Sequence, residues 1–204
     1  AHELVFQLNK EYFTSNNSFI FNKLKNINNY FDQDLQIKSS NKHIKPIFIF
    51  GLPRSGSTLI EKIILKGTSN YISGEETRIF NSLVDNIFFT KDKINILKCL
   101  DQINDKYLEL IKSDENANCF TDKSLNNFFF LGWIKKLFPN AKLINCSRDP
   151  LIIISSVLRN NLQNLSWAHK INDIVQYIDT YNNVFKKWRD EFNINLYEIN
   201  YSNL

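Results

Sequence analysis

Residues 51–58 combine the residue types and the spacing of a loop that binds a phosphate group. An apolar stretch, Ile47-Phe-Ile-Phe50, ends at Gly51, and a pattern typical of a helix begins at Thr58. In a strand–loop–helix of this kind, the N–H groups of the turn and of the first helical residues lack backbone partners, and the helix dipole favours negative charge beside them. Gly51 and Gly56 allow the chain to turn tightly. The stretch, called the phosphate loop below, therefore predicts an anion site.

The spacing of this loop is that of a Walker A motif, G-x-x-x-x-G-K-[ST], but Ser57 occupies the lysine position. Without the lysine, the loop lacks the cation that binds the β and γ phosphates of a nucleoside triphosphate. Arg54 can instead bind an anion through two parallel hydrogen bonds. The motif spacing keeps a P-loop kinase or NTPase as an alternative interpretation, which the missing lysine disfavours. The lack of an apolar strand that ends in a magnesium-binding aspartate disfavours it further.

Two more cations lie at the ends of strand-like stretches. Lys123 ends one such stretch, and Arg148 directly follows another. Asp149 is a good helix N-cap and Pro150 a good first helical residue, so a second helix begins where a strand ends and offers a second anion site. Because the carboxyl ends of parallel strands meet at one edge of a sheet, we expect these cations to lie near the phosphate loop.

Strand-like and helix-like patterns alternate along the chain, which predicts an α/β fold: a P-loop-like three-layer fold with a central parallel sheet flanked by helices. The expected strands are 47–50, 71–73, 119–123, 142–147 and 195–201. The expected helices are 58–66, 79–90, 92–111, 128–138, one that begins at 150, and 167–192. Residues 1–45 read as a helical leader of two short helices, the expected tail of a preceding N-terminal region. Residues 46–204 read as one domain truncated at its C-terminal end.

Composition narrows the class of protein. The chain has 204 residues, of which 43% are hydrophobic and 23% charged, enough for one sizeable core. The net charge of +4 is modest and shows no basic stripe, so a small anionic ligand is favoured over a nucleic acid. The three cysteines are far apart and lack metal-ligand spacing, which indicates buried thiols in a reducing compartment and no metal site. No apolar run is long enough for a membrane span.

The motifs resemble those of one known family. Pro-Arg-Ser-Gly-Ser-Thr at residues 53–58 resembles the 5′-phosphosulfate loop of sulfotransferases that use 3′-phosphoadenosine-5′-phosphosulfate (PAPS). Ser147-Arg-Asp-Pro150, with Ser156 eight residues after the arginine, resembles their motif for the 3′-phosphate. The similarity extends from about Ile47 to Tyr201. It implies transfer of a sulfuryl group from PAPS to a hydroxyl or phenol, with no metal.

The resemblance also implies roles for individual residues. Lys123 and Arg54 are expected to stabilise the leaving phosphate, and Glu76, in the stretch Gly74-Glu-Glu-Thr-Arg78, is the expected general base by similarity to tyrosylprotein sulfotransferases. Glu75 is the alternative base. The residues expected to hold PAPS are Arg54, Ser55, Gly56, Ser57, Thr58, Arg148 and Ser156.

The chain departs from the family pattern at two places. Family members commonly carry another arginine twelve residues after the one that binds the 3′-phosphate, but Asn160 stands there and Arg159 is one step early. Cytosolic sulfotransferases use a histidine shortly after the catalytic lysine, whereas Leu125 and Asn126 occupy that region. The second departure favours a glutamate base.

The resemblance gives only the class of the acceptor substrate and the type of organism and compartment. Residues 58–65 resemble the bacterial branch often fused to tetratricopeptide repeats, which implies a cytoplasmic bacterial protein. The acceptor could be a small molecule, a saccharide or a peptide tyrosine. A nucleotide-binding module without turnover is the third hypothesis.

Overall fold

The computed structural model describes residues 1–38 and 41–203. Five parallel strands form one sheet in the order β2-β3-β1-β4-β5. The strands are β1 (Ile47–Gly51), β2 (Tyr71–Ser73), β3 (Cys119–Asp122), β4 (Lys142–Ser147) and β5 (Tyr197–Asn200). The central strand β1 pairs with β3 on one side and with β4 on the other. The predicted α/β fold with a central parallel sheet is therefore confirmed.

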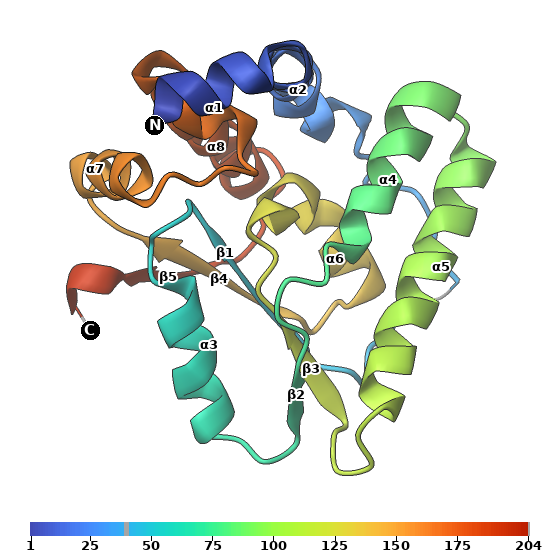
Figure 1. Cartoon of the computed structure of the whole chain (residues 1–204). Coiled ribbons are helices and arrows are strands. Elements are labelled where there is room, and N and C mark those ends of the chain that lie inside the picture. The colour runs from blue at the N-terminus through green and yellow to red at the C-terminus, as the bar shows by residue number, and fades with distance from the viewer. Residues whose placement is uncertain (39–40, 204) are drawn as a thin grey trace.

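Side chains alternate between the two faces of β1, and each face has its own apolar core. Ile47 and Ile49 pack with Ile60 of α3 (Ser57–Lys66). Phe48 and Phe50 point the other way, into the larger cluster that includes residues of α5 (Lys93–Lys112), α6 (Leu131–Leu137) and α8 (Ile171–Asp190). Figure 1 shows the same division, with α3 on one side of the strands and α5 and α6 on the other.

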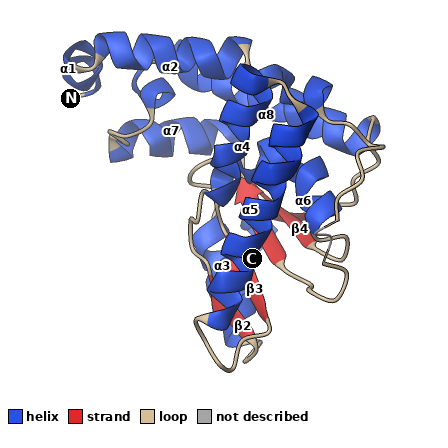
Figure 2. Ribbon diagram, turned by 90° about the vertical axis from the view of Figure 1, so that its right-hand side faces the viewer, coloured by secondary structure: helices blue, strands red, loops and turns tan. Residues whose placement is uncertain are grey.

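Helices connect the strands and build the outer layers (Figure 2). The leader contributes α1 (His2–Leu8), α2 (Lys10–Asn22) and the 3-10 helix η1 (Leu24–Tyr30). The helices that follow α3 are η2 (Ile79–Asn81), α4 (Ser82–Asp85), η3 (Asn86–Thr90), α5 (Lys93–Lys112), η4 (Leu125–Phe130), α6 (Leu131–Leu137), α7 (Pro150–Asn160), η5 (Ser166–His169), α8 (Ile171–Asp190) and η6 (Tyr201–Asn203).

Three of the expected helices are less regular than their sequence patterns indicate. The one expected at 128–138 is a 3-10 helix as far as Phe130 and an α-helix from Leu131 to Leu137. The helix expected at 79–90 consists of a 3-10 turn, one α-helical turn and a π-helical turn. The helix expected to begin at Trp167 is interrupted at Lys170, which is extended (φ −130°, ψ 136°). The Trp167 ring stacks on Tyr177, with ring centroids 3.9 Å apart. This contact requires the turn at 166–169 to fold back onto α8, so a continuous helix is impossible here.

Within the described ranges, no helix combines the length and the apolar character that crossing a bilayer requires.

Candidate active site

The phosphate loop joins β1 to α3 and has an unusual backbone. Arg54 and Gly56 both have positive φ, at 71° and 97°. Gly56 is the N-cap of α3, so no side chain at that position caps the N–H groups of the first turn. The helix begins at Ser57, one residue earlier than predicted. These N–H groups and the helix dipole make the loop suited to hold a phosphate.

Ser55 lies at the floor of this loop and has an unused hydroxyl. Its side chain is 1% exposed, and its Oγ has no hydrogen-bond partner among the described residues. Buried hydroxyls normally have a partner, so the Ser55 hydroxyl is free to bond a ligand atom in the loop. A Cβ atom at Gly51 would lie 2.8 Å from Ser55 Oγ and 2.3 Å from the Cys146 carbonyl oxygen. Glycine at position 51 therefore allows the close approach of β1 to Cys146 of β4 and to the Ser55 side chain.

The second predicted anion site lies directly against the phosphate loop. Arg148 Nη1 donates a hydrogen bond to the Arg54 carbonyl oxygen at 3.2 Å, and Arg54 Nε donates to Ser156 Oγ at 3.0 Å. Asp149 caps α7 as predicted, since its carboxylate accepts the N–H groups of Leu151 and Ile152. The two stretches, about a hundred residues apart in sequence, thus form one cation-rich edge of the sheet.

Tyr201 also belongs to this edge, although it was not among the predicted site residues. Its ring lies 4.5 Å from the Arg148 guanidinium carbon, and a Cβ atom at Gly56 would come within 2.3 Å of its Cδ2. The residue follows β5, which pairs with β4. A search for aromatic residues one step beyond the last strand of the sheet would have found it.

Glu76 and Lys123 form the other part of the candidate site. Lys123 Nζ lies 3.5 Å from Glu76 Oε1, and Arg78 Nη2 lies 3.3 Å from Glu76 Oε2. The Lys123 side chain is 10% exposed, whereas that of Glu76 is 42% exposed and can reach a ligand. The pair contains the carboxylate and the cation that the sequence predicted. Lys123 contacts Glu76, while Arg54 contacts Ser156.

Glu75 contributes its backbone rather than its side chain. Its carbonyl oxygen accepts the Lys123 N–H at 2.7 Å, its φ is 50°, and its side chain is exposed. Of the two glutamates, Glu76 is therefore the one whose carboxylate meets Lys123 in this structure.

Comparison with known proteins decides the family. Residues 46–204 match the family described as "Sulfotransferase family". This chain belongs to that family.

Two proteins similar to this sulfotransferase-family chain have low sequence identity to it. An uncharacterized protein of Aquifex aeolicus (strain VF5) is 25% identical over 177 residues, which cover 78% of this chain and 23% of that protein. Protein-tyrosine sulfotransferase 1 of Danio rerio is 28% identical over 130 residues, which cover 58% of this chain and 36% of that protein. The chain therefore spans only about a quarter to a third of the length of these relatives.

The cysteine side chains near and away from the candidate site are buried. Cys146, at the end of β4, is 2% exposed, and burial raises the pKa of its thiol to about 11. The thiol is thus protonated at neutral pH and is a poor nucleophile. Cys99 and Cys119 are buried as well, as predicted. Across residues 1–38 and 41–203, no cluster of three or more His, Cys, Asp and Glu side chains is arranged to hold a metal ion.

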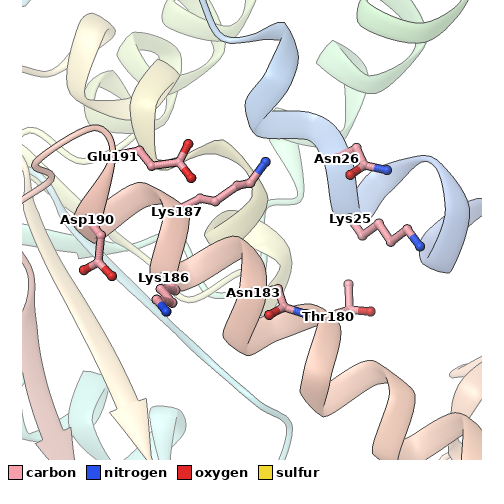
Figure 3. A pocket seen from close by; sticks show the side chains of 8 residues that line it. All are labelled: Lys25, Asn26, Thr180, Asn183, Lys186, Lys187, Asp190 and Glu191. Carbon is pink, nitrogen blue, oxygen red and sulfur yellow. The ribbon is translucent and has the colours of Figure 1, made fainter.

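Two cavities lie near α8, and only one of them borders the site. A cavity of about 390 Å³ is lined by Leu52 and Arg148 from the two anion-binding stretches and by Tyr181 and Phe185 of α8. The other, about 420 Å³, lies between η1 and α8 (Figure 3). Its lining residues are Lys25, Asn26, Thr180, Asn183, Lys186, Lys187, Asp190 and Glu191. None of the predicted site residues is among them, so the larger cavity lies apart from the proposed chemistry.

Proposed function

We propose that this chain is a PAPS-dependent sulfotransferase domain that transfers a sulfuryl group to a hydroxyl or phenol. The observation that carries the proposal is the contact between the two anion-binding stretches, through Arg148, Arg54 and Ser156. PAPS presents two phosphate groups, at the 5′ and 3′ positions of one ribose. A ligand of this kind needs two neighbouring anion sites, and membership of the sulfotransferase family supports the same donor.

The residues present fit this donor. The first turn of α3, with Ser57 and Thr58, and the unpartnered hydroxyl of Ser55 would hold the 5′-phosphosulfate. Arg148 and Ser156 would hold the 3′-phosphate. Both side chains now contact Arg54, so a bound phosphate would replace or share these contacts. Charge-assisted hydrogen bonds from arginine are among the strong ones in proteins.

The chemistry requires a base on one side of the sulfur atom and a cation on the other. Glu76 would take the proton of the acceptor hydroxyl as its oxygen forms a bond to sulfur. The bond between sulfur and the bridging phosphate oxygen breaks, and the negative charge that develops on this oxygen would be stabilised by Lys123 and Arg54. Lys123 Nζ lies 3.5 Å from Glu76 Oε1, so cation and base are neighbours, and this ion pair would have to open to admit the acceptor oxygen and the sulfur between them.

The acceptor is proposed only by class. Similarity to a protein-tyrosine sulfotransferase favours a peptide tyrosine among hydroxyl and phenol acceptors, with saccharides and small phenols as the other members of the class. Incubation with radiolabelled PAPS and a panel containing a tyrosine peptide, a small phenol and a saccharide tests this ranking. Label on the saccharide alone would refute the phenol preference.

Calorimetric titration tests the donor. We expect adenosine 3′,5′-bisphosphate to bind tightly, and ATP and GTP to bind weakly with or without magnesium. Tight binding of ATP with magnesium, without binding of the bisphosphate, would overturn the proposal in favour of a P-loop kinase or NTPase. Binding of the bisphosphate without transfer to any acceptor would point to a nucleotide-binding module.

A further inference from the structure

The segment that carries Glu76 runs alongside the end of β3. The pairing of β2 with β3 continues beyond the strand, since the Gly74 N–H donates to the Thr121 carbonyl oxygen at 2.9 Å. In the opposite direction, the Lys123 N–H donates to the Glu75 carbonyl oxygen at 2.7 Å. These two bonds hold the backbone on the N-terminal side of Glu76.

Side chains hold the C-terminal side. The Thr77 hydroxyl donates to Asp122 Oδ2 at 2.6 Å, and the Arg78 N–H donates to Ser124 Oγ at 2.8 Å. Asp122 is fully buried, and the Ser124 N–H donates to its other oxygen, Oδ1, at 2.7 Å. Tyr107 of α5 adds a third donor, at 2.5 Å from Oδ2. The carboxylate is thus completely satisfied and firmly placed.

Backbone conformation makes this support necessary. Glu75 and Arg78 have φ of 50° and 52°, so the dipeptide Glu76–Thr77 is flanked by two left-handed residues that are not glycine. Such conformations are unfavourable for residues with a Cβ and persist only where the surroundings hold them. The hydrogen bond from Thr77 to Asp122 joins this dipeptide to the residue that directly precedes Lys123.

We propose that Thr77, held by the buried Asp122 carboxylate, is the positioning residue that places Glu76 against Lys123. Asp122 immediately precedes Lys123, and Thr77 immediately follows Glu76, so the hydrogen bond between Thr77 and Asp122 links the neighbours of the two functional side chains. Neither Thr77 nor Asp122 touches the reacting atoms. This inference rests on the proposed role of Glu76, and two kinds of measurement separate them.

The first measurement does not need turnover. Thr77→Val keeps the shape of the side chain and removes its donor, whereas Thr77→Ser keeps the donor. Hydrogen exchange on the whole chain should show the Lys123 and Arg78 amides exchanging at least about tenfold faster in Thr77→Val, with Thr77→Ser close to wild type. Unchanged exchange in Thr77→Val would overturn the inference, whatever the enzyme does with its acceptor.

The second measurement asks whether Thr77 acts through Glu76. With radiolabelled PAPS and a tyrosine peptide as probes, Thr77→Val should lower kcat by roughly tenfold to 100-fold and leave the Kd for adenosine 3′,5′-bisphosphate unchanged. The double variant Glu76→Gln/Thr77→Val should be no slower than Glu76→Gln alone. Losses that multiply would mean that Thr77 acts elsewhere and would overturn the inference.

Tyr107→Phe is the matched control. It removes the other hydroxyl that donates to the same Asp122 oxygen but leaves the bond to Thr77 in place. We expect a less stable protein whose kcat is unchanged, and a kcat loss equal to that of Thr77→Val would overturn the positioning role. If the wild type does not bind the bisphosphate, the proposed function fails by itself. The hydrogen-exchange result still tests whether Thr77 holds the segment.

Discussion

Arg54 Nε lies 3.0 Å from the hydroxyl of Ser156, which joins the phosphate loop to the second turn of α7. The same arginine accepts a hydrogen bond from Arg148 through its carbonyl oxygen. One residue of the predicted 5′-phosphosulfate loop therefore touches both residues predicted to bind the 3′-phosphate. The two anion sites are best tested as a unit, with ligands that carry one or both phosphate groups.

Arg148→Ala should separate the two phosphate sites. We expect binding of adenosine 3′,5′-bisphosphate to weaken by about 1.5–3 kcal/mol, the scale of a hydrogen bond to a charged group, and binding of adenosine 5′-phosphosulfate to change little. Calorimetric titration of both ligands measures the difference. Arg159→Ala, which removes an exposed arginine on the same helix, is the matched control and should leave both affinities unchanged. Equal losses for both ligands in Arg148→Ala would refute the assignment.

Glu76→Gln keeps the size of the side chain and removes the proton acceptor. Transfer should fall by roughly 10²–10⁴-fold while nucleotide affinity stays within a few-fold of wild type, because a general base acts in the transition state. Glu75→Gln is the control and should be mild, since Glu75 contributes its carbonyl oxygen to the contact with Lys123. The reverse pattern would move the base by one residue.

Gly56→Ala should damage the phosphate loop. The residue has φ of 97°, and a Cβ atom would lie 2.3 Å from Tyr201 Cδ2. We expect the free energy of unfolding to fall by about 1–3 kcal/mol and nucleotide binding to weaken. Urea unfolding measures the first effect. Gly67→Ala is the control, because its φ is −88° and the nearest atom to the new Cβ is 3.5 Å away.

Tyr201→Ala tests how much of this effect is steric. Added to Gly56→Ala, it removes the clashing ring but not the unfavourable φ, so it should recover part of the lost stability. No recovery at all would show that the backbone conformation accounts for the whole loss.

Stability should decrease in mild acid because of His169. Its ring stacks on Phe13, with centroids 5.1 Å apart, and its Nδ1 lies 3.2 Å from Nδ1 of His2. Burial, and then the neighbouring His2, lowers the pKa of His169 below 6.5. The unfolded chain therefore binds more protons just below pH 6.5. The stabilising contribution is complete above the unfolded pKa and is lost as pH falls through the lower, folded one.

Urea unfolding between pH 5 and pH 8 measures this decrease. His169→Asn should flatten the profile, and His43→Asn, at an exposed histidine, should not. A wild-type profile that stays level down to pH 5 would contradict the prediction.

Much of the fold could be predicted because the three central strands, β1, β3 and β4, are short, largely buried runs that end in Gly51 or are followed by Lys123 or Arg148. All five strands appear near their predicted positions, and Asp149 caps α7 as its type and position indicate. The break at Lys170 could not be predicted, because it depends on Trp167 stacking on Tyr177, a contact between residues ten positions apart. Local periodicity carries no information on such a contact.

The site residues that belong to sequence motifs could be predicted. The residues that hold them in position could not, because they lie on other segments of the chain. Glu76, Lys123, Arg54, Arg148 and Ser156 all lie at the carboxyl edge of the sheet, in the two contact groups described above. Asp122 lies within the strand expected at 119–123, and its place in the sequence predicts no further role. Its partners, Thr77 and Tyr107, lie on two other segments, so its function in the network appears only in three dimensions.

The position of β1 in the centre of the sheet has a consequence for how the chain matures. Its partners, β3 and β4, are made long after it, and β2 pairs with β3 rather than with β1. During synthesis, the apolar residues of β1 therefore emerge from the ribosome well before β3 and β4, the strands that pair with β1, have emerged. Contacts so distant in sequence fold slowly. The phosphate loop, anchored at the end of β1, can take its ligand-binding form only after residue 147 has left the ribosome.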